Sequence, residues 1–457
     1  MPPKVSSTCD HSKLVFSASR NAKEVGYKRP TLLQRIAATT AQGSANGTAI
    51  TKVSTAEKVE DSPTFPGPLI LPGDDLSWDP SYPPQSLRSW VRDKDRNKVT
   101  AERRTVYIAA PPEVEPNLEF VQKWIHPQVK SRKGLKAVDR PSTKDVLSYL
   151  KAFYHGLPVK MLPPSSLRFT DDVDDDIPDP RRRTIWMKTQ AESGCVGIRT
   201  RATPKGDFTH QLNLNDLLDA AIDILPDDAY ALLLLVEHDI YEDEEDEFAC
   251  GRAYGGSRIA VVSSARYNPV LDEKEGLERE HAWPASHCER YVERCCDTVD
   301  SEEGSRKRTG VGKSLVEGES SKTTTNGEVT TPMQAALSAH ASLPSIDQSP
   351  SAIALSGLWF GRVCRTASHE LGHCFGIDHC VYYACCMQGT GSLREDSRQP
   401  LYLCPIDLAK ILRATGSDAK GHYGALLAFC EKNMDTHLFA AYRSWICGRV
   451  KEIERVD

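Results

Sequence analysis

The 457-residue sequence lacks any apolar segment long enough to cross a membrane or to act as a secretory signal. Its longest candidate run is Ala231 to Val236, whereas a spanning helix needs roughly 20 apolar residues in succession. The N-terminus also lacks an apolar core of the roughly 7 to 15 residues found in signal peptides. We therefore expect a soluble protein with no membrane partner, located in the cytoplasm or the nucleus.

The sequence also lacks an excess of positive charge. Its 57 Lys and Arg residues are outnumbered by 63 Asp and Glu residues, which gives a formal net charge of −6. No stripe of basic residues interleaved with aromatic ones occurs in the sequence, and such clustered charge is what binds phosphate backbones. Nucleic acid is therefore not an expected partner, and we expect a mildly acidic monomer.

Two stretches lack the composition that a folded core requires. Residues 1–62 are rich in Ser, Thr and Ala and poor in acidic residues, which predicts a flexible N-terminal tail and leaves a mitochondrial transit peptide open as an alternative. Residues 297–350 consist mainly of Ser, Thr, Gly, Glu and Lys with few aromatic residues. Such a segment buries too little apolar surface to offset the entropy of ordering, so we predict a disordered insert at 297–350.

The rest of the chain is predicted to be one folded domain, 105–457, preceded by a Pro-rich arm at 63–104. Apolar β-branched runs predict strands, and apolar residues at helical spacing predict helices. Strands are predicted at 105–110, 157–162, 195–201, 229–236 and 258–264, and helices at 115–126, 142–154, 213–225, 405–414 and 424–445. Their alternation indicates an α/β (α+β) fold with a mostly parallel mixed sheet.

Cysteine, in contrast, is abundant. The chain has 14 Cys residues, and many of them lie between positions 364 and 404. A chain of this length has enough residues to build a core without a disulfide framework, so free thiols and metal ligands explain the cysteines better. The cysteine content therefore favours a reducing compartment.

One stretch of eleven residues carries the strongest chemical signal. It runs from His369 to His379 and reads HExxHxxGxxH. Residues four apart share one face of a helix, so His369 and His373 are predicted to bind one zinc ion, and a turn at Gly376 returns His379 as the third ligand. Three imidazoles leave a fourth tetrahedral position open for water, as in catalytic zinc sites. Glu370 is then the expected general base.

The residues after this motif continue a metal-binding pattern. The sequence resembles the archaemetzincins, in which the zinc helix is followed by a Cys, a second Cys five residues on, the Met of the Met-turn and a closing CxxC. Four residues match: Cys380, Cys385, Met387 and Cys404. The resemblance implies a second, structural zinc bound by four sulfurs, but Asp407 stands where the last Cys is expected. Zinc accepts an oxygen ligand, although a carboxylate suits a soft site less well; Cys374 and Cys386 are nearby thiols that stay open as substitutes.

The resemblance implies a metzincin-like zinc protease domain whose zinc-binding helix begins near Leu355. It implies a zinc metallopeptidase that hydrolyses peptide bonds in a peptide or protein substrate, with two zinc ions per chain and Met387 as an apolar floor under the histidines. An alternative is a non-catalytic, zinc-stabilised peptide-binding or scaffold protein. That alternative gives no purpose to Glu370 or to the open coordination position.

The strand predicted at 258–264 is the last one before the zinc helix, and the predicted insert lies between the two. In metzincins the edge strand in this place borders the cleft, so the resemblance implies that extended substrate pairs with it by strand addition. An interior strand without a ligand role is the alternative.

Other polar residues are predicted to have no metal-binding role. His238, His281 and His287 have no partner at ligand spacing, which indicates ordinary loop residues. The Cys-x-His pair at Cys9 and His11 is isolated, and we interpret it as incidental. The acidic stretch at 171–176 is predicted to be a solvated loop rather than a calcium site.

Overall fold

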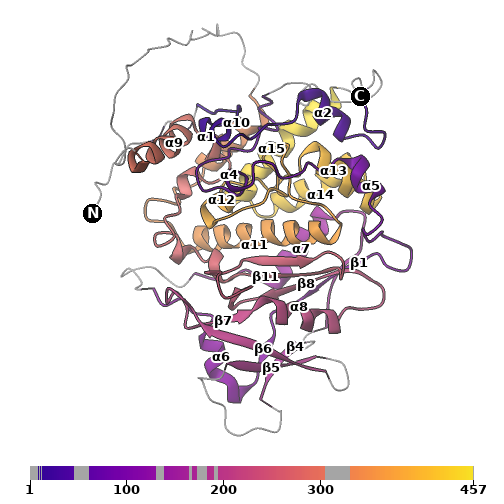
Figure 1. Ribbon diagram of the computed structural model, residues 1–457, viewed down its shortest axis with the longest axis vertical. Helices are drawn as coiled ribbons and strands as arrows, with labels where there is room; N and C mark the ends of the chain where they lie inside the picture. The colour runs from indigo at the N-terminus through magenta and orange to yellow at the C-terminus, as the bar shows by residue number, and fades with distance from the viewer. Residues whose placement is uncertain are drawn as a thin grey trace.

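The computed structural model describes residues 9, 11, 13–45, 61–129, 138–163, 167–171, 183–189, 194–303 and 330–455. These residues form two β-sheets and a layer of helices, with the first sheet between the helices and the second sheet (Figure 1). The mixed α/β class predicted from the sequence is confirmed.

The first sheet is mostly parallel, as predicted. Its strand order is β10-β11-β8-β1-β3, in which β11, β8, β1 and β3 run parallel and β10 pairs antiparallel with β11. The strands are β1 (Thr105–Ala109), β3 (Val159–Met161), β8 (Ala229–Val236), β10 (Gly251–Tyr254) and β11 (Ile259–Ser263).

The central strand β8 separates two hydrophobic cores. All eight of its residues are buried. Leu233 packs into the core under the helices, and its neighbours Leu232 and Leu234 pack into the core against the second sheet. A strand with both faces covered reads as a continuous apolar run, which explains why it was easy to predict.

The second sheet was largely missed by the sequence analysis. It has the order β2-β4-β5-β6-β7-β9 and is mainly antiparallel. Its strands are β2 (Glu113–Val114), β4 (Leu167–Thr170), β5 (Thr184–Thr189), β6 (Cys195–Ala202), β7 (His210–Asn213) and β9 (Asp239–Tyr241), of which only β6 was predicted. These strands are short and several have polar sequences, so their apolar periodicity is weak. Helices η2 (Pro116–Leu118), α6 (Glu119–Lys123) and α8 (Leu214–Asp223) accompany this sheet, and Asn213 caps α8.

The helical layer covers the other face of the first sheet (Figure 1). It comprises α7 (Thr143–Phe153), α11 (Ala352–Cys374), α12 (Leu393–Ser397), α13 (Pro405–Thr415), α14 (Ala419–Glu431) and α15 (His437–Glu454). Ser142 caps α7, as its sequence predicts. Helix α11 packs directly on β10 and β11, which places its C-terminal half beside the edge of the sheet.

The structure differs from the predicted flexible tail. Residues 13–45 contain α1 (Arg20–Glu24) and α2 (Leu32–Ala38), each with an N-terminal cap. The Tyr27 hydroxyl donates to the Val381 carbonyl at 2.5 Å, and Arg35 is fully buried. Residues 64–71 of the Pro-rich arm are also buried, and the arm includes α4 (Asp75–Trp78) and α5 (Leu87–Arg92). Residues 46–60, and most of the first twelve, lie outside the described residues.

The predicted disordered insert is wrong for residues 330–350. Helix α10 (Pro332–Ala341) starts with a capping box at Thr331 and Gln334, and its Met333 and Ala336 are fully buried against α15. Helix α9 (Glu289–Glu303) also extends into the predicted insert. The predicted insert is polar in its overall composition, and this concealed one short, alanine-rich helix with an apolar side. Residues 304–329 lie outside the described residues.

Strand β11 is an interior strand, so its assignment as the edge strand is wrong. It pairs with β8 on one side and with β10 on the other. The edge is formed by β10, whose short sequence Gly-Arg-Ala-Tyr gives little strand signal. The chain reaches β10 through a segment that also holds β9.

Four short helical turns lie between β11 and α9. The turns are η3 (Ala265–Tyr267), η4 (Pro269–Leu271), η5 (Arg279–His281) and η6 (Ala285–His287). His238, His281 and His287, predicted as ordinary loop residues, are all buried. The acidic stretch at 171–176 is described only at Asp171. Among the described helices, none is both long and apolar enough to span a membrane.

Candidate active site

Helix α11 and the turn that ends it carry the HExxHxxGxxH motif. Ser351 caps the first turn by accepting a hydrogen bond from the Ala354 amide. At the other end, Gly376 adopts φ +72°, and its amide donates to the His373 carbonyl at 2.8 Å. Glycine adopts this left-handed conformation without strain. The turn predicted at Gly376 therefore exists, and it brings His379 back toward the helix.

The structure brings His369, His373 and His379 together. One ring nitrogen from each lies within 4.8 Å of the others. His369 Nδ1 lies 2.7 Å from the Cys386 carbonyl, and His373 Nδ1 lies 2.7 Å from the Ile377 carbonyl. A ring nitrogen that faces a carbonyl carries the proton, so both Nε2 atoms present lone pairs toward the space between the rings.

These three side chains fit a zinc ion. The Nε2 atoms of His369 and His373 are 3.0 Å apart, an arrangement in which two lone pairs repel unless a cation lies between them. Burial lowers the pKa of His369 well below its ordinary value and that of His373 to about 3, with neighbouring histidines adding to both shifts. Neutral imidazoles are the form that binds metal.

Glu370 lies beside the three histidines, next to the edge strand. Its side chain is 8% exposed, and a Cβ atom added to Gly251 would lie 3.0 Å from Glu370 Cγ and 3.2 Å from Glu370 Oε1. Burial raises the pKa of this carboxyl to about 8, and the charge of Arg252 opposes that rise. Gly251 thus leaves the space that Glu370 occupies between α11 and β10.

Met387 packs against the zinc helix, as the resemblance implied. It is fully buried, and a Cβ atom added to Gly372 would lie 2.8 Å from Met387 Cε and still nearer to its sulfur. A second glycine serves the third histidine: a Cβ atom on Gly389 would lie 2.6 Å from His379 Nδ1 and would also clash with the Asp75 carboxylate. Both glycines therefore permit close contacts under and beside the histidines.

Cys380, Cys385, Cys404 and Asp407 also come together. All four are buried, and one ligand atom from each lies within 4.8 Å of the others. Cys380 Sγ and Cys404 Sγ are 3.6 Å apart, and Asp407 Oδ2 lies 3.4 Å from both Cys385 Sγ and Cys404 Sγ. Backbone amides of Met387 and Cys404 donate to Cys385 Sγ. Three sulfurs and one oxygen at these spacings fit a tetrahedral metal site.

Asp407 uses its two oxygens differently. Oδ2 faces the sulfurs, and Oδ1 accepts a hydrogen bond from the buried Lys410 Nζ at 2.8 Å. Burial raises the pKa of Asp407 to about 6, and Lys410 opposes the rise. Cys386 and Cys374 are outside this group: Cys386 Sγ contacts Ser368 and the Arg365 carbonyl instead. Of the three candidates for the fourth ligand, Asp407 therefore lies in the group, and the thiols of Cys374 and Cys386 do not.

A cleft of about 1390 Å³ contains the three histidines and Glu370. Its walls include residues 245–253 on the side of β10, residues 95–97 of the Pro-rich arm and residues 390–394. The lining includes Asp93, Asp95, Glu245, Asp246 and Glu247, which we call the acidic rim, and also Arg96, Arg252 and Arg394. The cleft is large enough for an extended peptide and is acidic along its rim.

Sequence reasoning missed the residues that hold the metal loop from the N-terminal side. Arg29 Nε donates to the Tyr382 carbonyl at 3.1 Å, and the Ala384 amide donates to the Pro66 carbonyl at 2.9 Å. Trp90 Nε1 donates to the Phe375 carbonyl at 2.9 Å. These contacts join segments about 300 residues apart in the sequence, so no local pattern could have revealed them.

Comparison with known proteins locates the family signal on the zinc helix and the loop after it. Residues 352–413 match the model of peptidase family M54. The chain is 24% identical to archaemetzincin-2 of Macaca fascicularis over 80% of its own length and 74% of that protein, and archaemetzincin-2 of Homo sapiens gives the same values. The chain is thus similar to the archaemetzincins. The match to peptidase family M54 and the similarity to the archaemetzincins indicate a zinc metallopeptidase, as the HExxHxxGxxH motif predicted.

Other relatives match over shorter stretches or at lower identity. Human archaemetzincin-1 is 42% identical over 14% of this chain and 13% of its own length. Among solved structures, an archaemetzincin from Methanopyrus kandleri aligns with 70% of this chain and 98% of its own, at 15% identity and a TM-score of 0.30.

Proposed function

We propose that the protein hydrolyses peptide bonds with a zinc ion bound by His369, His373 and His379 and with Glu370 as general base. The observation that supports this most is the position of Glu370, which is buried beside the two helical ligands and lines the same cleft. A purely structural zinc site needs no such carboxylate. Bound zinc lowers the pKa of water toward ~7 and polarises a carbonyl oxygen.

The chain's own residues then supply positioning and proton transfer. The carbonyls of Cys386 and Ile377 fix the rings of His369 and His373. Glu370 takes a proton from the attacking water and gives it to the amine nitrogen that leaves.

We propose that β10 binds the substrate backbone. Within the described chain, β10 has a strand partner on one side only, β11, and its residues 251–253 line the cleft on the other. Free backbone amides and carbonyls of an edge strand pair with an extended peptide. The acidic rim favours peptides that carry Lys or Arg, because opposite charges attract across a partly desolvated cleft.

We propose that Cys380, Cys385, Cys404 and Asp407 bind a second, structural zinc. Its position supports a role in holding Met387: the Cys380 amide donates to the Met387 carbonyl at 2.7 Å, and the Met387 amide donates to Cys385 Sγ. The two sites therefore share one loop. None of the fourteen cysteines forms a disulfide in this structure, which supports a cytoplasmic or nuclear location, where cysteines stay reduced.

A peptide library tests the proposed function. The purified, zinc-loaded protein is incubated with peptides that differ in charge on both sides of every bond, and products are identified by mass spectrometry. We expect cleavage that stops on chelation, returns with added zinc and prefers peptides with Lys or Arg. Absence of cleavage by protein that holds a full catalytic zinc would contradict the proposal, and a preference for acidic peptides would contradict the role of the rim.

A further inference from the structure

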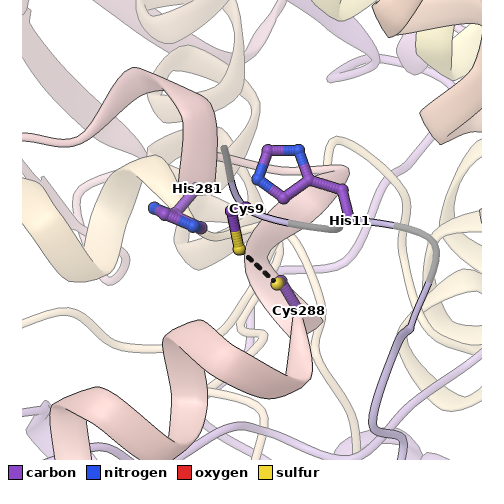
Figure 2. A group of neighbouring side chains, drawn as sticks. All are labelled: Cys9, His11, His281 and Cys288. Atoms are coloured by element: carbon purple, nitrogen blue, oxygen red, sulfur yellow. Dashed lines mark hydrogen bonds between the residues drawn. The ribbon is translucent and has the colours of Figure 1, made fainter. Parts of the chain in front are cut away.

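A third group of metal-binding side chains lies outside both sites described above. It consists of Cys9, His11, His281 and Cys288, and one ligand atom from each lies within 4.8 Å of the others. Figure 2 shows the two sulfurs facing each other with the two imidazoles beside them. Two thiols and two imidazoles form a donor set that zinc binds in structural sites.

His281 is arranged as a metal ligand is. Its ring is 2% exposed, and its Nδ1 lies 2.7 Å from Glu278 Oε2. A carboxylate in this place fixes the proton on Nδ1 and leaves the lone pair on Nε2, which is the usual support of a metal-bound histidine. Among the described residues, no hydrogen-bond partner reaches the buried Nε2 of His281. The face of Tyr291 stacks on the ring at 4.3 Å between centroids and holds its orientation.

The two cysteines are close together and do not form a disulfide. Cys9 Sγ and Cys288 Sγ are 3.1 Å apart, about 1 Å more than a disulfide bond. Cys288 is fully buried directly before α9, and Cys9 packs against the same small apolar cluster. Zinc-bound sulfurs, each about 2.3 Å from the ion, stand roughly 3.8 Å apart in a tetrahedron. A small outward movement of one side chain therefore gives the spacing of a metal site.

Backbone pairing holds the N-terminal pair of residues in place. The Val15 amide donates to the His287 carbonyl at 2.8 Å, and the Glu289 amide donates to the Lys13 carbonyl at 3.0 Å. These bonds fix residues 13–15 against the segment that contains Cys288. Leu14 forms a β-bridge with Cys288. Cys9 lies only five residues before Leu14 in the sequence.

We propose that Cys9, His11, His281 and Cys288 bind a structural zinc ion that fastens the N-terminal segment to the wall of the catalytic cleft. The link to the cleft is short, because Tyr291 stacks on His281 and also lines the cleft. The ion crosslinks residues that are 279 positions apart. It keeps residues 13–45 in place, and these include Tyr27, which holds the loop of the second metal site.

Two of the four residues form a Cys-x-His pair, and the other two lie about 270 positions further along the chain. Cys9 and His11 were treated as an isolated pair, and His281 as a residue without a ligand partner. Each half of the group has only two ligands, so neither half forms a recognisable motif. The fold brings the two halves together.

Metal content of the full-length protein tests the site independently of activity. The protein is purified with reductant, freed of loosely bound metal and analysed for zinc by mass spectrometry. We expect the Cys9→Ser/His11→Ala variant to contain one zinc fewer per chain than wild type. The matched control is Cys295→Ser, a cysteine of α9 that packs on the same cluster but is not in the group; it should keep the wild-type zinc content.

A second variant distinguishes metal binding from a general structural role. Glu278→Gln keeps a polar partner for His281 but removes the carboxylate, and loss of such a partner typically weakens metal binding about 10- to 100-fold. One equivalent of zinc should then pass to a chelator about 10 to 100 times more readily, with unchanged circular dichroism. Equal zinc content in Cys9→Ser/His11→Ala and wild type would overturn the proposal, as would a Cys9–Cys288 disulfide in reductant-purified protein. These results would leave the hydrolase proposal untouched.

Discussion

A single methyl group tests whether Met387 forms the floor of the catalytic site. Gly372 lies between Glu370 and His373 on α11, and a Cβ atom there would lie 2.8 Å from Met387 Cε. Met387 is fully buried, so Gly372→Ala forces the methionine away from the histidines. Overpacking of this kind costs about 1–3 kcal/mol, whereas alanine gains about 1 kcal/mol over glycine through helix propensity.

The matched control is Gly424→Ala on α14. Gly424 is also a helical glycine, but it is exposed, and a Cβ atom there meets nothing within 4 Å. It should therefore stabilise the protein by about 1 kcal/mol. The free energies of unfolding of the two variants, measured in urea with zinc present, should differ by about 1–3 kcal/mol, and only Gly372→Ala should lose peptidase activity. If Gly372→Ala is as stable and as active as Gly424→Ala, Met387 does not support the site.

Two further predictions concern buried ionisable side chains. Asp407→Cys should destabilise the protein by up to about 3–5 kcal/mol, because Lys410 loses its buried partner. The double variant Asp407→Cys/Lys410→Met should recover the stability and, in chelator competition, bind the second zinc more tightly than wild type. An Asp407→Cys protein as stable as wild type would refute the role of the ion pair. His238 is buried with its pKa lowered to about 4. Between pH 6.5 and 4, His238 is therefore protonated in the unfolded chain but not in the folded protein, so stability falls as pH drops through this window. His238→Gln should reduce that slope by up to about 1.4 kcal/mol per pH unit, and an unchanged slope would contradict the assignment.

The sequence predicted the parts of the fold whose signal is local. The strand at 229–236, the helices at 142–154 and 213–225, and the helix that carries His369 and His373 all follow from apolar spacing. The order of residues after His379 also pointed correctly to a cluster that includes Asp407. These features depend on residues within a few turns of one another.

The parts that failed depend on distant contacts. Residues 13–45 have a weakly apolar sequence, yet they are ordered because Tyr27 and Arg29 hydrogen-bond to the loop at 381–382. Strand β10 carries almost no strand signal and forms because β11 offers it a partner. Helix α10 owes its order to α15. In each case tertiary contact supplied the free energy that local propensity lacks.

The most direct test of the central claim compares Glu370→Gln with His373→Ala. Glutamine keeps the size and polarity of the glutamate but cannot accept the proton, so zinc content should stay at the wild-type level while the rate of peptide hydrolysis falls about 10²- to 10⁴-fold. His373→Ala removes a ligand and should lose both the catalytic zinc and the activity, whereas Glu119→Gln, at an exposed glutamate of α6 outside the cleft, should lose neither.

The decisive measurement is the hydrolysis rate of zinc-loaded Glu370→Gln protein. The account predicts a full complement of zinc with hydrolysis reduced by at least about 10²-fold. Cleavage at the wild-type rate by that variant would contradict the assignment of Glu370 as the general base.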